Sequence, residues 1–178
     1  MCMCPFFADN WDMALHKCWR IIPLLAVVAA GAAQEFDSFA VSTEMVAMRD
    51  GVKLATDLFR PARSGQPVND RFPVLLVRTP YNKAGERRNG ESLARHGYVV
   101  VAQDCRGRFA SQGDFYAFVN EGRDGYDAIE WAAAQPWSNG KVGAYGGSYL
   151  AWDQYHAAMY KPPHLAAMFA VVGGANFY

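Results

Sequence analysis

The chain has 178 residues, of which 52% are hydrophobic and 16 are glycine, and its 17 basic and 17 acidic residues leave a formal net charge of zero. This length and composition suit one folded domain with a sizeable core and exclude a disordered chain. Because there is no basic surplus, nucleic acid is not expected as a partner.

Residues 1–33 are expected to lie outside the fold, as an N-terminal extension and signal peptide. Lys17 and Arg20 precede the apolar run Ile21–Ala33, which ends in small residues with an A-x-A pattern. These features are typical of a secretory signal peptide, here at about residues 13–33. The run is shorter than the about 20 apolar residues of a membrane span. We therefore expect a secreted or periplasmic protein with no stable membrane span after cleavage; an uncleaved membrane anchor is the alternative.

Signal cleavage would leave a single cysteine in the chain. It would remove Cys2, Cys4 and Cys18 and retain Cys105, which cannot form an internal disulfide alone. Because Cys105 follows an apolar run, we expect a small packing residue. The alternative is a nucleophile, which would need a base and an activating environment.

Residues 34–178 are expected to form an α/β domain that starts with an antiparallel hairpin. Val41–Phe59 alternates between apolar and polar residues around Asp50-Gly51, and an Asp-Gly pair in such a context is a strong hairpin signal. The next stretch, Pro61–Arg71, is rich in proline, glycine and polar residues and predicts a surface loop.

After this loop the sequence predicts alternating strands and helices, which is typical of a largely parallel sheet with helices on both faces. Continuous apolar runs indicate buried strands at Phe72–Val77, Tyr98–Ala102, the run that begins at Lys141, and Leu165–Val172. Helices are expected from Glu91 to His96, from a capping Asn120 to about Gln135, and from the end of the Lys141 run to about Tyr160. Polar loops are expected at Arg78–Lys83 and Cys105–Phe115.

The stretch Lys141–Ala151 is the first candidate for chemistry. A short apolar run ends in Gly146, Gly147 and Ser148 and turns directly into a helical segment. A nucleophile elbow has this context: a serine on a strained turn exposes its hydroxyl, and small neighbours let strand and helix approach closely. Leu150 stands where the pattern G-x-S-x-G has its last glycine. The alternative is a glycine-rich turn with an incidental serine.

Three motifs occur in order along the chain, at Arg78–Lys83, Gln103–Gly113 and Gly146–Tyr149. Their order resembles the cocaine-esterase-like and X-Pro dipeptidyl-peptidase family of α/β-hydrolases, over nearly all of the chain that follows the signal peptide. The elbow of that family is G-x-S-Y-x-G, which accounts for Leu150 and places Ala151 at the last glycine.

This resemblance implies a serine hydrolase of esters or of peptide and amide bonds. Ser148 matches the nucleophile, which would form an acyl-enzyme with the substrate. The backbone N–H of Tyr149 matches one donor of the oxyanion hole, and the phenolic hydroxyl of Tyr81 matches the second. The expected partner is a small-molecule ester, an amide or a short peptide. The sequence contains no metal-binding cluster and no phosphate loop, so no cofactor is expected.

Several other polar and aromatic residues are interpreted as structural. Asp104 and Arg106 are expected to hold their loop by a salt bridge and backbone hydrogen bonds. Trp131, Trp137 and Trp152 are expected to pack in the core or against helices.

The base and the acid of a catalytic triad are not assigned. In α/β-hydrolases they follow the serine, and Ser148 is followed only by Asp153, His156 and His164. His156 is expected roughly 12 Å along the helix from the serine, while His164 and His96 precede strands at the opposite end of the sheet.

The chain is therefore expected to be the N-terminal portion of a truncated α/β-hydrolase, without the cap and C-terminal β domain of the family. It would be inactive alone, and Leu165–Val172 would form an exposed apolar edge that is prone to aggregation. A catalytically incompetent product, or a fragment complemented by a separate chain that carries the histidine, are the alternatives.

Overall fold

A computed structural model describes residues 35–174. The predicted extension and signal peptide lie outside the described residues. Every described residue belongs to one compact unit, Ala32–Tyr178, which begins after Gly31. None of the helices in this part is long and apolar enough to cross a membrane.

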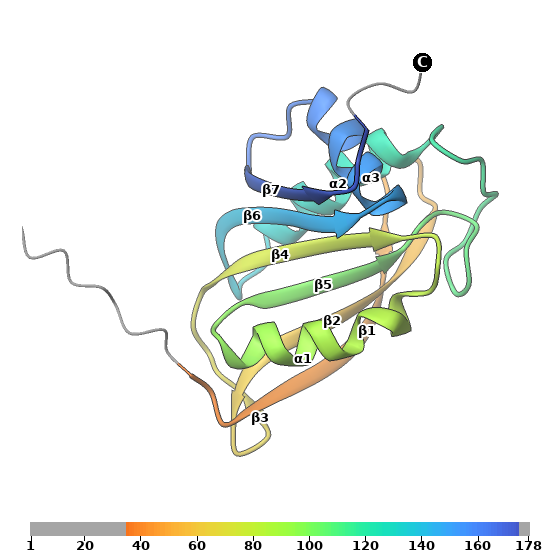
Figure 1. Ribbon diagram of the computed structural model, residues 1–178. Coiled ribbons are helices and arrows are strands. Elements are labelled where there is room, and N and C mark those ends of the chain that lie inside the picture. The colour runs from red at the N-terminus through yellow and green to blue at the C-terminus, as the bar shows by residue number, and fades with distance from the viewer. Residues whose placement is uncertain (1–34, 175–178) are drawn as a thin grey trace, which may run out of the picture. The chain divides into compact units, whose positions relative to one another are not determined.

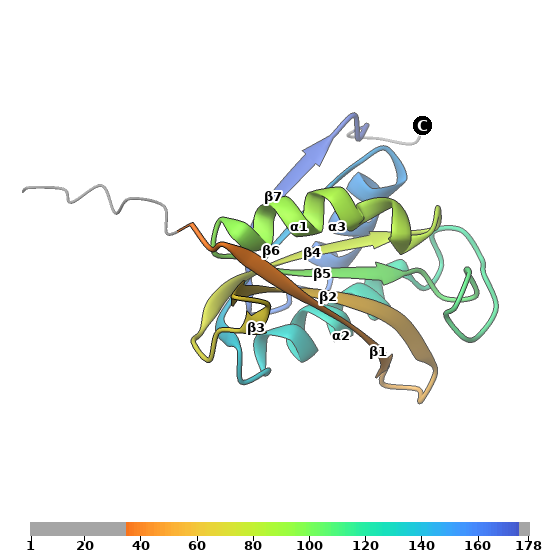
Figure 2. The same ribbon diagram turned by 90° about the horizontal axis from the view of Figure 1, so that it is seen from below.

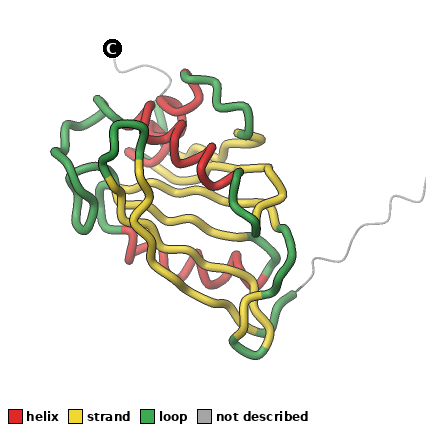
Figure 3. The backbone as a smooth tube through the Cα atoms, turned by 180° about the vertical axis from the view of Figure 1, so that it is seen from behind, coloured by secondary structure: helices red, strands yellow, loops and turns green. Residues whose placement is uncertain are grey.

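The described residues form one twisted sheet of seven strands in the order β1-β2-β5-β4-β6-β7, with β3 beside β2 (Figures 1 and 3). The strands are β1 (Ser38–Ala47), β2 (Lys53–Arg63), β3 (Gln66–Pro67), β4 (Phe72–Thr79), β5 (Val99–Asp104), β6 (Ser138–Gly147) and β7 (Leu165–Val171). The helices are a 3-10 turn, η1 (Lys83–Glu86), and α1 (Arg87–Arg95), α2 (Glu121–Ala133) and α3 (Tyr149–Met159).

The sheet combines an antiparallel hairpin with a parallel part, as the sequence predicts. β2 pairs antiparallel with β1 and β5. β4 runs parallel to β5 and β6, and β6 runs parallel to β7. The arrows of these four strands therefore point the same way in Figure 1, so that their carboxyl ends share one edge of the sheet.

The predicted hairpin turn at Asp50-Gly51 is confirmed. Gly51 has φ 84°, a left-handed conformation that glycine adopts without steric cost. The carboxylate of Asp50 accepts a hydrogen bond from the N–H of Val52 at 3.1 Å. Met48 closes the turn by donating its N–H to the carbonyl of Val52 at 2.8 Å.

Two of the predicted loops are partly wrong, because strands continue into them. The predicted loop Pro61–Arg71 is shorter, since β2 extends to Arg63 and pairs with β3. Arg78 and Thr79 end β4 instead of opening a loop. Arg78 can stay in a buried strand because its guanidinium donates to the Gln103 side chain and to the Glu121 carbonyl, each at 2.9 Å.

Two helix starts also differ from the prediction. α1 begins at Arg87, one turn before the predicted Glu91, and the two side chains form an ion pair of 2.8 Å between Nε and Oε1. α2 begins after Asn120 as expected, but the Asn120 side chain makes no capping hydrogen bond. Its backbone carbonyl instead accepts from the N–H of Asp124 at 3.0 Å.

Apolar side chains alternate between the two faces of the central strands, so both faces are buried. Figure 2 shows α1 and α2 on opposite sides of the sheet. The face toward α2 and α3 consists mainly of Leu58, Val74, Leu76, Val99, Val101 and Val142, packed on Ala128, Ile129, Ala132 and Ala157. The face toward α1 consists mainly of Phe59, Val77, Val100 and Ala102, packed on Ala94.

The tryptophans pack as predicted. The Trp131 and Trp137 rings lie 6.1 Å apart at the edge of the core. Trp152 on α3 lies 6.4 Å from the ring of Phe118.

β7 is an edge strand of the described sheet, since it pairs only with β6. Its apolar side chains are exposed, among them Met168 (44%), Phe169 (70%) and Val171 (41%). The predicted apolar edge is thus confirmed for the described part of the chain.

Candidate active site

Ser148 occupies the junction between β6 and α3 with φ 55° and ψ −120°. L-residues rarely adopt such a conformation, because it is sterically strained. The Ser148 N–H donates to the carbonyl of Val171 on β7 at 2.9 Å, and its carbonyl accepts from the N–H of Ala151 at 3.0 Å. Its backbone is thus held from both sides while the residue stays exposed. The structure therefore has the geometry of a nucleophile elbow.

The residues around Ser148 show why small side chains are needed. Gly146 has φ 143°, and a Cβ there would lie 2.5 Å from the Cβ of Leu150. Leu150 itself packs back over the glycine. The methyl group of Ala151 is fully buried, and a Cβ on Gly173 would lie only 2.8 Å from it. The glycine at 173 therefore leaves room for the alanine at 151.

Tyr149, the first residue of α3, is fixed by its side chain. Its hydroxyl donates to Glu121 Oε1 at 2.6 Å and accepts from the N–H of Phe118 at 3.1 Å. Its ring stacks on Phe118 with centroids 4.4 Å apart. Burial, reinforced by the Glu121 carboxylate, raises the pKa of the Tyr149 phenol. The first N–H groups of a helix have no partner inside it, so the backbone N–H of Tyr149 is of the kind that binds anions.

Tyr81 lies beside Tyr149. It follows β4, and its N–H donates to Thr79 Oγ1 at 3.0 Å. Tyr81 is 62% exposed, and its ring lies 6.2 Å from the ring of Tyr149 in an edge-on arrangement. The loop is held further by Lys83, whose N–H donates to Asp104 Oδ1 at 2.7 Å and whose Nζ lies 2.9 Å from Asp57. The fold thus brings the two expected oxyanion-hole residues together from the loop after β4 and the start of α3.

The predicted salt bridge between Asp104 and Arg106 is wrong, although both residues do hold their loop. Arg106 instead forms a bidentate pair with Asp124 on α2, at 2.6 and 2.9 Å, and a further pair with Asp50 at 2.7 Å. Asp104 accepts from Lys83. The bend that follows β5 turns the two side chains toward different elements. Their closeness in the sequence does not reveal this difference in direction.

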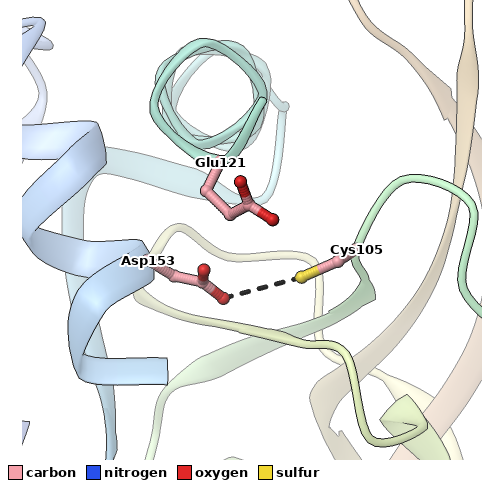
Figure 4. Close-up of side chains that lie close together, drawn as sticks. All are labelled: Cys105, Glu121 and Asp153. Carbon is pink, nitrogen blue, oxygen red and sulfur yellow. Dashed lines mark hydrogen bonds between the residues drawn. The ribbon is translucent and has the colours of Figure 1, made fainter. Parts of the chain in front are cut away.

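Next to the elbow lies a buried cluster that the sequence did not indicate: Cys105, Glu121 and Asp153 (Figure 4). Cys105 Sγ lies 3.6 Å from Asp153 Oδ2. Burial raises the pKa of the Cys105 thiol well above its ordinary value and raises the pKa of Asp153 to about 7. Cys105 is therefore no activated nucleophile, as predicted, but it packs against polar groups. No local motif links residues so far apart in the chain.

The described histidines contact groups other than Ser148. His96 Nδ1 lies 2.7 Å from the carbonyl of Ser92. His164 Nδ1 lies 2.7 Å from Glu130 Oε2, before the first residue of β7. The ring of His156 on α3 lies 5.8 Å from that of Phe118. Residues 35–174 thus supply the serine without a histidine hydrogen-bonded to it.

A mostly parallel sheet with an exposed serine on a strained strand-to-helix turn at its carboxyl edge defines an α/β-hydrolase. Residues 50–178 match the family described as X-Pro dipeptidyl-peptidase (S15 family). The chain therefore belongs to the X-Pro dipeptidyl-peptidase (S15) family, and the family resemblance of its motifs is confirmed.

Relatives of this chain are hydrolases. It is 43% identical over 143 residues to cocaine esterase of Rhodococcus sp. (strain MB1 Bresler), covering 77% of this chain and 24% of that protein. It resembles an α-amino acid ester hydrolase (TM-score 0.64, 28% identity, 84% of this chain and 28% of that one). It also resembles a CocE/NonD family hydrolase from Staphylococcus aureus (TM-score 0.63, 32% identity, 72% and 27%). The chain spans about a quarter of the length of each.

Proposed function

We propose that the chain carries the nucleophile and the oxyanion hole of a serine hydrolase that cleaves esters or peptide and amide bonds. The strained, exposed conformation of Ser148 (φ 55°) carries this proposal. In the proposed reaction Ser148 Oγ attacks the substrate carbonyl carbon, its proton passes to a base, and the leaving group departs to give an acyl-enzyme. Water then releases the acyl group.

The proposed oxyanion hole consists of the backbone N–H of Tyr149 and the hydroxyl of Tyr81. The position of Tyr149 at the start of α3 supports it, because a helix N-terminus favours negative charge. The edge-on contact of the two rings at 6.2 Å also supports it. Each such donor contributes about 3 kcal/mol of transition-state stabilisation.

The base and the acid of the triad are proposed to lie outside the described residues. The hydrogen bonds of His96 and His164 to other groups support this. Without a base the rate falls by about six orders of magnitude. A catalytically incompetent chain is therefore the second candidate for the 178 residues in isolation.

The proposed substrates are small esters, amides or short peptides. The relatives, an esterase and an α-amino acid ester hydrolase, support this class. We also propose export to the periplasm or the medium, which rests on the apolar run Ile21–Ala33. N-terminal sequencing of the exported protein tests this: a first residue near position 34 is expected, and an intact N-terminus contradicts it.

Covalent capture of the serine by a fluorophosphonate probe tests the proposed nucleophile. The 178-residue chain is incubated with the probe, with and without imidazole as a substitute base, and the labelled peptide is identified by mass spectrometry. We expect imidazole to accelerate capture at Ser148. Ser148→Ala should abolish it, whereas Ser42→Ala, which alters an exposed serine on β1, should not.

The two candidate functions give different results. Capture at Ser148 without imidazole means that a base is already present. Capture only with imidazole supports a preformed nucleophile and oxyanion hole without a base. No capture at Ser148 in a folded chain, under either condition, contradicts the proposed nucleophile.

A further inference from the structure

Three side chains from different elements converge next to the elbow (Figure 4). Cys105 follows β5, Glu121 begins α2 and Asp153 belongs to α3. They are 0%, 3% and 3% exposed. The sulfur atom and one carboxylate oxygen from each acid all lie within 4.8 Å of one another.

The carboxylates of this cluster are incompletely bonded. Glu121 Oε1 accepts from Tyr149 and Asp153 Oδ2 lies against the Cys105 thiol. Glu121 Oε2 and Asp153 Oδ1 are buried without a hydrogen-bond partner. A buried carboxylate oxygen without a partner is costly, so its presence calls for a ligand. In Figure 4 both carboxylates face the sulfur atom, so the space between them is where such a ligand would bind.

The charges of the surrounding residues indicate the kind of ligand. Arg78 is the cation that acts on both Cys105 and Asp153, and its Nη1 donates to the Glu121 carbonyl. Arg78 also pairs with the buried carboxylate of Asp124, its Nη2 lying 3.7 Å from Oδ2, so it does not compensate the cluster alone. When a divalent cation binds, the Cys105 thiol releases its proton, and the thiolate and the two carboxylates are then paired with the bound cation.

We propose that Cys105, Glu121 and Asp153 form a binding site for a divalent transition-metal ion of the zinc type. Zinc accepts thiolate sulfur at about 2.3 Å and carboxylate oxygen at about 2.0–2.2 Å. Small side-chain shifts bring atoms that lie within 4.8 Å of one another to these distances. The sulfur ligand disfavours magnesium and calcium, which prefer oxygen ligands.

A metal ion here would join the loop after β5 to α2 and α3. Because Glu121 also accepts from Tyr149, the ion would stiffen the support of the elbow. This inference does not depend on the proposed hydrolase activity, since metal binding is measured directly.

Cobalt binding tests the site, because a thiolate bound to Co²⁺ gives a ligand-to-metal charge-transfer band in the near ultraviolet. The full chain is used with Cys2, Cys4 and Cys18 replaced by serine, so that Cys105 is the one thiol left. We expect stoichiometric binding, a thiolate band that excess Zn²⁺ removes, and a higher Tm in the presence of Zn²⁺. Absence of the band in this folded chain overturns the proposal.

Single substitutions in the same background locate the ligands. Cys105→Ser should remove the charge-transfer band, and Asp153→Asn should weaken Co²⁺ affinity about 100-fold or more. Asp127→Asn is the matched control, since Asp127 lies on α2 but pairs with Arg49; it should leave the affinity unchanged. Equal affinity in Asp153→Asn and Asp127→Asn overturns the proposal. Circular dichroism verifies that each variant is folded. If a variant unfolds, the proposal is still tested by the presence or absence of the charge-transfer band in the chain that retains Cys105, Glu121 and Asp153.

Discussion

Gly146 and Leu150 lie close together beside Ser148, so that only one of them can carry a side chain there. A Cβ at position 146 would lie 2.5 Å from the Cβ of Leu150, at φ 143°. The backbone that presents Ser148 therefore depends on a missing side chain two residues earlier. The local pattern made this visible in the sequence, because a strained turn needs glycine wherever chains approach closely.

Gly146→Ala should destabilise the protein by about 2 kcal/mol or more, through backbone strain and overlap with Leu150. Urea unfolding measures the change in the free energy of unfolding. Gly85→Ala is the control, because no atom lies within 4 Å of its Cβ position. It should change stability by less than about 0.5 kcal/mol. Similar losses in both variants would contradict the steric explanation.

Tyr149 and Tyr81 allow structural and catalytic roles of a hydroxyl to be separated. Tyr149→Phe leaves Glu121 Oε1 without its 2.6 Å donor, so it should cost about 1–3 kcal/mol of stability. Tyr81 is 62% exposed, and Tyr81→Phe should leave the free energy of unfolding unchanged. It should instead slow imidazole-assisted capture at Ser148 about 100-fold. An unchanged rate of capture in Tyr81→Phe would contradict the proposed role of Tyr81 in the oxyanion hole.

At the scale of elements, Arg106 joins the hairpin turn and α2 through the loop that carries it. Its pair with Asp124 is buried, since the two side chains are 12% and 2% exposed. Arg106→Ala should therefore cost about 3 kcal/mol, because it leaves a buried carboxylate poorly paired. Arg49→Ala, which removes a half-exposed pair with Asp127, should cost less than about 1 kcal/mol.

Acid should weaken the same connection. The hydrogen bond from Arg106 lowers the pKa of Asp50. A carboxylate with a lowered pKa in the folded state contributes stability above its unfolded pKa of about 4, and loses it as the pH falls through the folded pKa. Unfolding curves are measured over a range of about three pH units, from pH 5 to pH 2. The free energy of unfolding should fall less over this range in Arg106→Ala than in the unsubstituted chain. Equal losses would contradict this role of Asp50.

The strands were predictable because both faces of the sheet are buried, which gives continuous apolar runs such as Val99–Val101. The elbow was predictable because its signal is local. The end of β4 was not, because the guanidinium of Arg78 donates hydrogen bonds to acceptors distant in sequence, the Gln103 side chain and the Glu121 carbonyl. The cluster around Asp153 was missed for the same reason. Three segments contribute one side chain each, and the spacing of these residues in the sequence does not predict that they lie close together.

At the scale of the molecule, the exposed edge of β7 should control self-association of the 178-residue chain. A long apolar edge strand can pair with another chain. Phe169→Lys places a charge on this edge and should reduce the fraction of oligomers in sedimentation velocity. Val119→Lys is the control, because Val119 is 67% exposed but lies in a loop. An equal reduction in both variants would mean that exposed hydrophobicity in general, and not the edge, drives association.

The hydrogen bond from Ser148 N–H to the carbonyl of Val171 connects Ser148 to that same edge strand. Amide hydrogen exchange occurs when such a bond opens, and edge strands open at lower free energy than central ones. The Ser148 amide should therefore exchange at a rate close to that of the β7 amides, and faster than the buried amides of β6. A partner that pairs with β7 would slow this exchange and raise the population of the conformer that presents the serine hydroxyl.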